Sequence, residues 1–199
     1  MGIYSTKTKW QTAIQPIVSA CVRHRVHPDA FTYGALGLSG LAAVVLARAS
    51  DAPWLLWLVP VCVLARLLLN LMDGQVARAL SVADAWGEVK NEFGDRLADA
   101  AIFAGLGLGG YADARLALIA IALILCVSYL GLLGKAIGSA RVYGGLFGKG
   151  DRMISFAAFT LIPLFSGDLT LYNWYLAFAA LAATITIVQR LALIRRQSV

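Results

Sequence analysis

The sequence predicts an all-α integral membrane protein, a bundle of six transmembrane helices with an interfacial amphipathic helix at its N-terminus. Three observations support this fold class. Of the 199 residues, 60% are hydrophobic and only 14% are charged, whereas soluble domains carry about 25% charged residues. The mean hydropathy of +0.75 agrees with this, because a soluble core cannot bury so much apolar surface. The apolar residues also gather in segments of roughly 20 residues, the length that a helix needs to cross a bilayer.

The first expected element is an amphipathic helix over residues 4–24, with Lys7 and Lys9 away from its apolar side. The apolar residues that share that side at helical spacing are Trp10, Ile14, Ile17, Val18 and Cys21. A helix of this kind lies on the membrane surface. We expect residues 1–28 to form this interfacial helix and a connector, and residues 29–199 to form one transmembrane domain.

Six segments follow that can cross a hydrocarbon core about 30 Å thick. They cover residues 29–49, 54–80, 86–110, 114–139, 152–166 and 171–193. The second and third segments carry charged residues. The fifth is short and needs a tilted position or a locally thinned bilayer.

Basic residues gather in the loops on one side of these spans. They are Lys7, Lys9, Arg23, Arg25, Arg141, Lys149, Arg152, Arg195 and Arg196. The opposite loops contain only Arg48 and Arg115, so the positive-inside rule predicts that both termini face the cytoplasm. The net charge of +6 then indicates contact with anionic headgroups and phosphates. Nothing in the chain resembles a nucleic-acid-binding module, and we expect no nucleic-acid partner.

Charged residues concentrate where the second span ends and the third begins. Ionisable side chains inside a membrane are costly without a partner or water, so they usually mark function. On the second span, Asn70, Asp73 and Ala77 share one face. On the third span, one face about 100° wide carries Glu88, Asn91, Glu92, Asp95 and Asp99. The two spans flank a short loop, so these faces can meet.

Two interpretations of this acidic face are open. It could be a solvated face at the cytoplasmic border, paired with Arg78, Lys90 and Arg96. Stacked like charges repel one another, however, and hard divalent cations with oxygen ligands remove that repulsion. Two such ions, Mg or Mn, can clamp a diphosphate during phosphoryl transfer, and Gly74 would let a ligand approach the backbone closely.

The motif that carries these residues resembles the signature of the CDP-alcohol phosphotransferases. In this chain it is Asn70-x2-Asp73-Gly74-x2-Ala77-Arg78-x8-Gly87-x3-Asn91-x3-Asp95. The family pattern is Asp-x2-Asp-Gly-x2-Ala-Arg-x8-Gly-x3-Asp-x3-Asp, so the spacing matches at every position. The resemblance also covers the whole chain, from the interfacial helix through the six spans.

Asn70 and Asn91 depart from this pattern, because the family has Asp at both positions. Asn can bind a metal through its carbonyl oxygen but brings no charge. One hypothesis is that Glu92 and Asp99, on the same helix face, restore the lost charge and that the protein is active. The other is that the protein has lost its metals and is a non-catalytic relative with a binding or scaffold role.

The resemblance implies roles for the motif residues and for Asp29 and Thr32, and the charge-compensation hypothesis adds Glu92 and Asp99. The basic residues in and near the Gly-rich loop before residue 152 suit an anionic headgroup or phosphate, although they could instead be cytoplasmic anchors. Asp95 or Asp99 would be the general base. The metal ligands would be Asn70, Asp73, Asn91, Glu92 and Asp95. The CDP group would be bound by Asp29, Thr32, Asp73, Gly74, Ala77 and Arg78. The acceptor or a phosphate would be bound by Lys135, Arg141, Lys149 and Arg152.

We therefore expect a transferase that moves a substituted phosphate, of phosphatidyl type, from a CDP-linked lipid to an alcohol and releases CMP in phospholipid biosynthesis. Its active site would face the cytoplasm of a bacterial or archaeal cell, it would contact membrane lipids, and the resemblance implies a possible homodimer. A small transporter is an alternative, since it also places carboxylates in a membrane cavity. The sequence does not identify the donor lipid or the acceptor alcohol.

Overall fold

The computed structural model describes residues 14–138 and 142–197, and every regular element in that part of the chain is a helix. The α-helices are α2 (Gln15–Arg23), α3 (Pro28–Ala47), α4 (Leu58–Ala79), α5 (Ala85–Leu108), α6 (Ala114–Ala136), α7 (Lys149–Ser166) and α8 (Tyr172–Gln197). Short 3-10 turns, η2 (Pro53–Trp57) and η3 (Leu169–Leu171), precede α4 and α8. The six expected spans thus fall on α3 to α8. Of the expected N-terminal helix, residues 15–23 are helical, whereas residues 4–13 lie outside the described residues.

Local side-chain signals explain where two of the helices begin. The Asp84 carboxylate accepts a hydrogen bond from the Gly87 backbone N–H at 2.6 Å, which caps the start of α5. At α7, the Asp151 carboxylate accepts from the Gly148 N–H at 3.2 Å. The fifth helix therefore begins at Lys149, three residues before the expected span, and Lys149 belongs to its first turn and not to the preceding loop.

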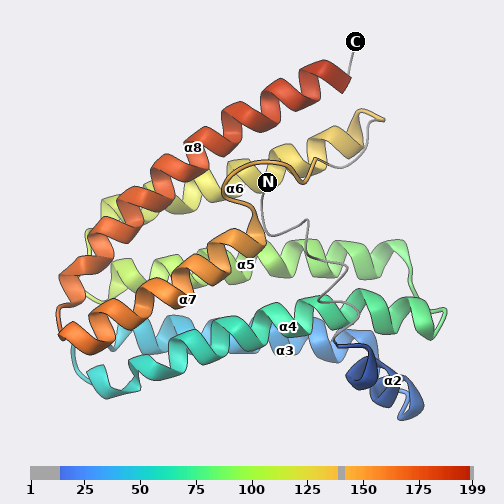
Figure 1. Cartoon of the computed structure of the whole chain (residues 1–199), viewed down its shortest axis with the longest axis horizontal. Helices are drawn as coiled ribbons and strands as arrows, with labels where there is room; N and C mark the ends of the chain where they lie inside the picture. Colours follow the sequence, from blue (N-terminus) through green and yellow to red (C-terminus); the bar gives the residue numbers. More distant parts are fainter. Residues whose placement is uncertain (1–13, 139–141, 198–199) are drawn as a thin grey trace.

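Helices α3 to α8 extend along the long dimension of the molecule, and their connections alternate between its two ends (Figure 1). Helix α3 packs against α4 and α5, α6 packs against α5 and α8, and α7 packs against α4. One end of the bundle carries α2, the α4–α5 connection and the C-terminus (Figure 1). The other end carries the α3–α4, α5–α6 and α7–α8 connections.

The centre of the bundle is apolar, and so is much of its outside. Aromatic side chains of α5, α7 and α8 contact one another in the core, with ring centroids of Phe103 and Phe156 5.9 Å apart and those of Phe156 and Tyr175 5.2 Å apart. Leu118 and Leu181 are 66% and 64% exposed. An apolar exterior of this kind suits a lipid environment. A smaller cluster anchors α2, because Ile14 and Val18 pack with Phe31, Met72 and Val76.

Four helical segments of the described chain are long and apolar enough to span a membrane: Pro28–Ala47, Pro53–Ala79, Ala114–Ala136 and Leu169–Gln197. They correspond to α3, α4 with η2, α6, and α8 with η3. Helices α5 and α7 alternate with them in sequence, and both carry several charged residues. Both helices contribute residues to the candidate site, together with α4, α6 and α8.

Candidate active site

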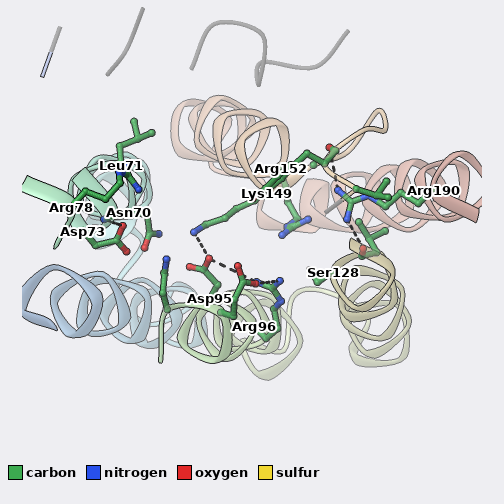
Figure 2. A pocket seen from close by; sticks show the side chains of 17 residues that line it. Asn70, Leu71, Asp73, Arg78, Asp95, Arg96, Ser128, Lys149, Arg152 and Arg190 are labelled. Atoms are coloured by element: carbon green, nitrogen blue, oxygen red, sulfur yellow. Dashed lines mark hydrogen bonds and ion pairs between the residues drawn. The ribbon is translucent and has the colours of Figure 1, made fainter. Parts of the chain in front are cut away.

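A cavity of about 210 Å³ opens at the end of the bundle that carries the α4–α5 connection. Side chains of α4, α5, α6, α7 and α8 and of the loop before α7 line it (Figure 2). Asn70 and Asp73 lie on one side of the cavity, whereas Arg152 and Arg190 lie on the other. The Lys149 side chain extends between these two sides and reaches Asp95.

The α4 side of the cavity holds a buried carboxylate with one unpaired oxygen. Asp73 is only 6% exposed, and its Oδ1 accepts from the Gly74 backbone N–H at 2.5 Å. Its Oδ2 has no hydrogen-bond partner within the described part of the chain, and neither does Asn91 Oδ1 on α5. Both residues line the cavity. Because unpaired buried oxygens are rare in folded proteins, these two atoms are suited to a ligand that the protein alone does not supply.

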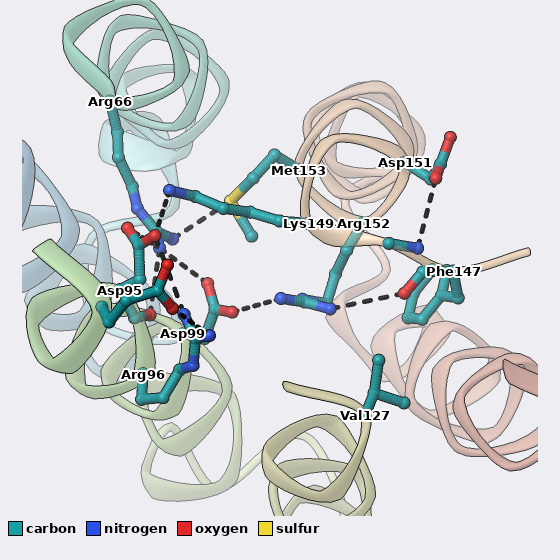
Figure 3. Close-up of polar contacts among 12 residues, drawn as sticks. Arg66, Asp95, Arg96, Asp99, Val127, Phe147, Lys149, Asp151, Arg152 and Met153 are labelled. Atoms are coloured by element: carbon teal, nitrogen blue, oxygen red, sulfur yellow. Dashed lines mark hydrogen bonds and ion pairs between the residues drawn. The ribbon is translucent and has the colours of Figure 1, made fainter. Parts of the chain in front are cut away.

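Asp95 on α5 lies among three cationic side chains (Figure 3). Lys149 Nζ lies 2.5 Å from its Oδ2. Arg96 Nη1 lies 3.8 Å from the same oxygen, and Arg66 Nη2 lies 3.9 Å from Oδ1. The next acidic residue, Glu92, also lines the cavity, and its carboxylate accepts from Arg96 Nη2 at 2.5 Å.

Asp99, the second candidate base, does not line the cavity. Its side chain is 2% exposed, and its Oδ1 accepts from Arg66 Nη2 at 2.7 Å. Its Oδ2 accepts from Arg152 Nη2 (Figure 3). Both arginines are buried, and Arg66 also donates to the Asp95 carbonyl oxygen at 3.2 Å and to Met153 Sδ at 3.1 Å. Asp99 therefore joins α4, α5 and α7 through a buried ion-pair network.

The oxygen donors of the cavity are suited to a divalent cation of the Mg or Mn type. Such ions prefer carboxylate and carbonyl oxygens, which Asp73, Asp95 and the two Asn side chains provide. Asn70 and Asn91 line the cavity together with these carboxylates. In residues 14–138 and 142–197, however, no group of three or more Asp, Glu, His or Cys side chains gathers as a metal site. The donor set thus depends on amide as well as carboxylate oxygens.

The residues predicted to bind CDP lie in four different settings. Asp73, Gly74 and Arg78 line the cavity, and a Cβ at position 74 would lie 3.2 Å from Arg78 Nη1. Ala77 does not line it. Thr32 lines a narrow adjoining space together with Asn70 and Asn91, whereas Asp29 is paired with Lys90 across α3 and α5.

The residues predicted to bind the acceptor also divide. Lys149 and Arg152 line the cavity. Lys135 does not; its Nζ lies 2.6 Å from Glu88 Oε1 in a pair whose lysine side chain is 55% exposed. Arg141 lies outside the described residues.

Sequence reasoning did not identify Arg190 or Arg66 as site residues. Arg190 lines the cavity from α8, and its guanidinium donates to the carbonyl oxygens of Val127 at 2.6 Å and Gly144 at 2.9 Å. It thereby connects α8 to α6 and to the loop before α7. A charged residue within an apolar helix is the signal that could have indicated both arginines.

No family model matches the chain. The chain is 30% identical over 161 residues to the inner membrane protein YnbA of Escherichia coli, covering 81% of this chain and 80% of YnbA. It is 30% identical over 205 residues to archaetidylinositol phosphate synthase of Aeropyrum pernix, covering 98% and 97%. It is 29% identical over 202 residues to phosphatidylinositol phosphate synthase of Cutibacterium acnes, covering 94% of each.

Two crystal structures of Mycobacterium tuberculosis phosphatidylinositol phosphate synthase share this architecture. One, with CDP-DAG bound, matches with a TM-score of 0.72 and 25% identity over 90% of this chain and 92% of that one. The other, in complex with manganese and citrate, matches with a TM-score of 0.72 and 26% identity over 90% and 87%.

Proposed function

The chain belongs to the CDP-alcohol phosphotransferase family, and on this premise we propose that the cavity lined by α4, α5, α7 and α8 is its active site. The protein is a metal-dependent integral membrane transferase that moves a phosphatidyl-type group from a CDP-linked lipid to an alcohol in phospholipid biosynthesis. The transporter and the non-catalytic relative are thereby set aside. The observation that carries the site assignment is that Asp73 and Asp95 meet Lys149, Arg152 and Arg190 around one cavity.

The α4 side of the cavity is the proposed site of the CDP group. Asp73, Gly74, Ala77 and Arg78 belong to the family motif, and three of them line the cavity. The absence of a side chain at Gly74 leaves room for Arg78, whose guanidinium is suited to pair with diphosphate oxygens. Asp29 and Thr32, on α3, are also proposed to bind the CDP group.

Asp95 is the proposed general base. It lines the cavity, and its carboxylate oxygens are within reach of a substrate hydroxyl bound there. It takes the proton of the acceptor hydroxyl, whose oxygen forms a bond to the phosphorus distal to cytidine. The bond from that phosphorus to the CMP oxygen breaks, and CMP leaves with the electron pair. A bound divalent cation supplies Lewis-acid stabilisation of the diphosphate charge.

The acceptor is proposed to carry a phosphate. Lys149, Arg152 and Arg190 bring three cationic side chains to the cavity, and arginine is suited to bidentate phosphate binding. The relatives named phosphatidylinositol phosphate synthase and archaetidylinositol phosphate synthase support an anionic acceptor of this kind. Lys135 and Arg141 remain proposed ligands of the acceptor or of a phosphate.

The number of divalent cations in the site depends on which carboxylates are available as ligands. The sequence predicted two, with Glu92 and Asp99 as the compensating carboxylates. Glu92 lines the cavity and is paired with Arg96, whereas Asp99 is turned toward Arg66 and Arg152. The position of Asp99 argues against its use as a ligand or base. Asp73 and the two amides are the stronger proposed ligands, whereas Asp95 is already paired with Lys149.

The proposal also includes how the helices lie in the membrane. We propose that α5 and α7 span the bilayer together with the four apolar segments, that α2 lies in the interface, and that residues 29–199 form one transmembrane domain. The positive-inside rule places the cavity at the cytoplasmic face. The homodimer stays a proposal that rests on the family resemblance.

Release of CMP from CDP-diacylglycerol by the purified protein tests this function, with a panel of alcohols and phosphorylated alcohols and with or without manganese. We expect manganese-dependent release that a phosphorylated alcohol stimulates. Asp95→Asn should reduce turnover at least 100-fold, as loss of a general base does. Glu88→Gln, in the exposed first turn of the same helix, is the matched control and should keep near-normal turnover. Equal activity of the two variants would refute the assignment of the base.

A further inference from the structure

We propose that this active site takes one divalent cation and that the Lys149 ammonium provides the second positive charge beside Asp95. The inference rests on the proposed function. It concerns how the chain balances charge at a site in which two motif positions are amides. The observations that carry it are the ion pairs around Asp95 and the unpaired oxygens around Asp73.

Most of the carboxylate charge in and near the cavity is already paired with protein cations. Asn70 and Asn91 bring no charge to the cavity, and Asp99, which does not line it, is bound by two buried arginines. Glu92 lies 2.5 Å from Arg96, and Asp95 lies 2.5 Å from Lys149. The carboxylates near Asp95 are therefore already compensated by protein cations.

Two unpaired oxygens belong to residues of the cavity wall. In the described part of the chain, Asp73 Oδ2 and Asn91 Oδ1 are buried without a hydrogen-bond partner, and both residues line the cavity. Asp73 is more than nine-tenths buried. One carboxylate oxygen and one amide oxygen, completed by oxygens of the donor diphosphate, form a reasonable ligand set for one hard cation.

The cationic groups around Asp95 repel a second divalent cation at this position. A second divalent cation at Asp95 would lie against Lys149, Arg96 and Arg66, whose nitrogen atoms are 2.5, 3.8 and 3.9 Å from the Asp95 carboxylate. Three positive groups at this range repel a further cation strongly in a partly buried site. The charge that a second metal would bring is thus already present.

Lys149 is also held in place by the fold. It is the first residue of α7, and the Asp151 side chain caps this helix start by accepting from the Gly148 N–H at 3.2 Å. Its side chain is only 24% exposed and extends across the cavity to α5 (Figure 2). A lysine fixed in this way can face both Asp95 and the phosphates of a bound donor.

The experiment is manganese binding to the full chain in nanodiscs, with CDP-diacylglycerol present. Equilibrium titration counts the bound ions, and electron paramagnetic resonance distinguishes an isolated Mn²⁺ from an exchange-coupled pair. We expect one ion per chain and an uncoupled spectrum for the wild type. The triple variant N70D/N91D/K149Q, which restores two carboxylates and removes the ammonium, should bind two ions with a coupled spectrum.

Arg115→Gln removes a positive charge at the opposite end of the bundle and is the matched control; it should still bind one ion. Two coupled ions in the wild type, with CMP release intact, would overturn the inference and leave the proposed function standing. Failure of the triple variant to gain a second ion would overturn it too. If the wild type binds no manganese and releases no CMP, the proposed function fails with it.

Discussion

Replacing Asp99 by Asn tests whether this carboxylate acts in the chemistry or in the architecture. Asp99 is 2% exposed, and it accepts hydrogen bonds from Arg66 and Arg152, which are 0% and 2% exposed. The substitution keeps the shape of the side chain but removes its charge. It also brings an amide N–H₂ group toward guanidinium donors that need an acceptor.

The expected loss of stability follows from those contacts. Each hydrogen bond to a charged group contributes about 1.5–3 kcal/mol, and Asp99 makes two of them. Breaking a buried pair by removing one partner costs about 3–5 kcal/mol, because the other charge is left uncompensated. Arg66 keeps its hydrogen bonds to the Asp95 carbonyl oxygen and to Met153 Sδ, which limits the loss of stability. We expect Asp99→Asn to destabilise the protein by about 3–4 kcal/mol.

The assay compares thermal inactivation and turnover of Asp99→Asn with those of Asp95→Asn. Asp99→Asn should lower the inactivation midpoint and keep turnover per folded molecule within about tenfold of wild type, since it leaves the cavity lining intact. Asp95→Asn should abolish turnover and affect the midpoint less.

A double-mutant cycle of Arg66→Met with Asp99→Asn should show a coupling of about 0.5–3 kcal/mol, because both changes break the same pair. A loss of orders of magnitude in turnover at Asp99→Asn, with an unchanged midpoint, would refute this reasoning. It would return Asp99 to the role of base or ligand.

Two further predictions concern the donor site and the topology. Asp73→Asn should abolish manganese-dependent binding of CDP, since it removes the buried carboxylate with an unpaired oxygen; isothermal titration calorimetry measures this, and small, equal effects of Asp73→Asn and Glu88→Gln would contradict it. Cysteines placed at Ser81 and Asp168 should react with a membrane-impermeant maleimide from opposite sides of the membrane, Ser81 from the cytoplasm. Labelling of both from one side would rule out the six-span topology.

Much of this molecule could be predicted from the sequence because helix formation in a membrane is a local matter. Apolar segments in a membrane must satisfy their own backbone groups and therefore form helices. The six predicted segments coincide with α3 to α8 to within a few residues at most ends, and four helical segments of the described chain are long and apolar enough to span a membrane. The motif spacing from Asn70 to Asp95 likewise identified α4 and α5, two of the five helices that line the cavity. The start of α7 was misplaced because its cap depends on a side-chain contact between Asp151 and Gly148.

Only the tertiary structure distinguished Asp95 from Asp99. The two carboxylates are one helical turn apart and about 40° apart around α5, so periodicity places both on the same face. Their surroundings differ because Arg66 comes from α4 and Arg152 from α7, and both guanidinium groups reach the Asp99 carboxylate. The contribution of Arg190, from the far end of the chain, likewise depends on packing between distant segments. Helix periodicity determines the direction in which a side chain points, and tertiary packing determines what it meets there.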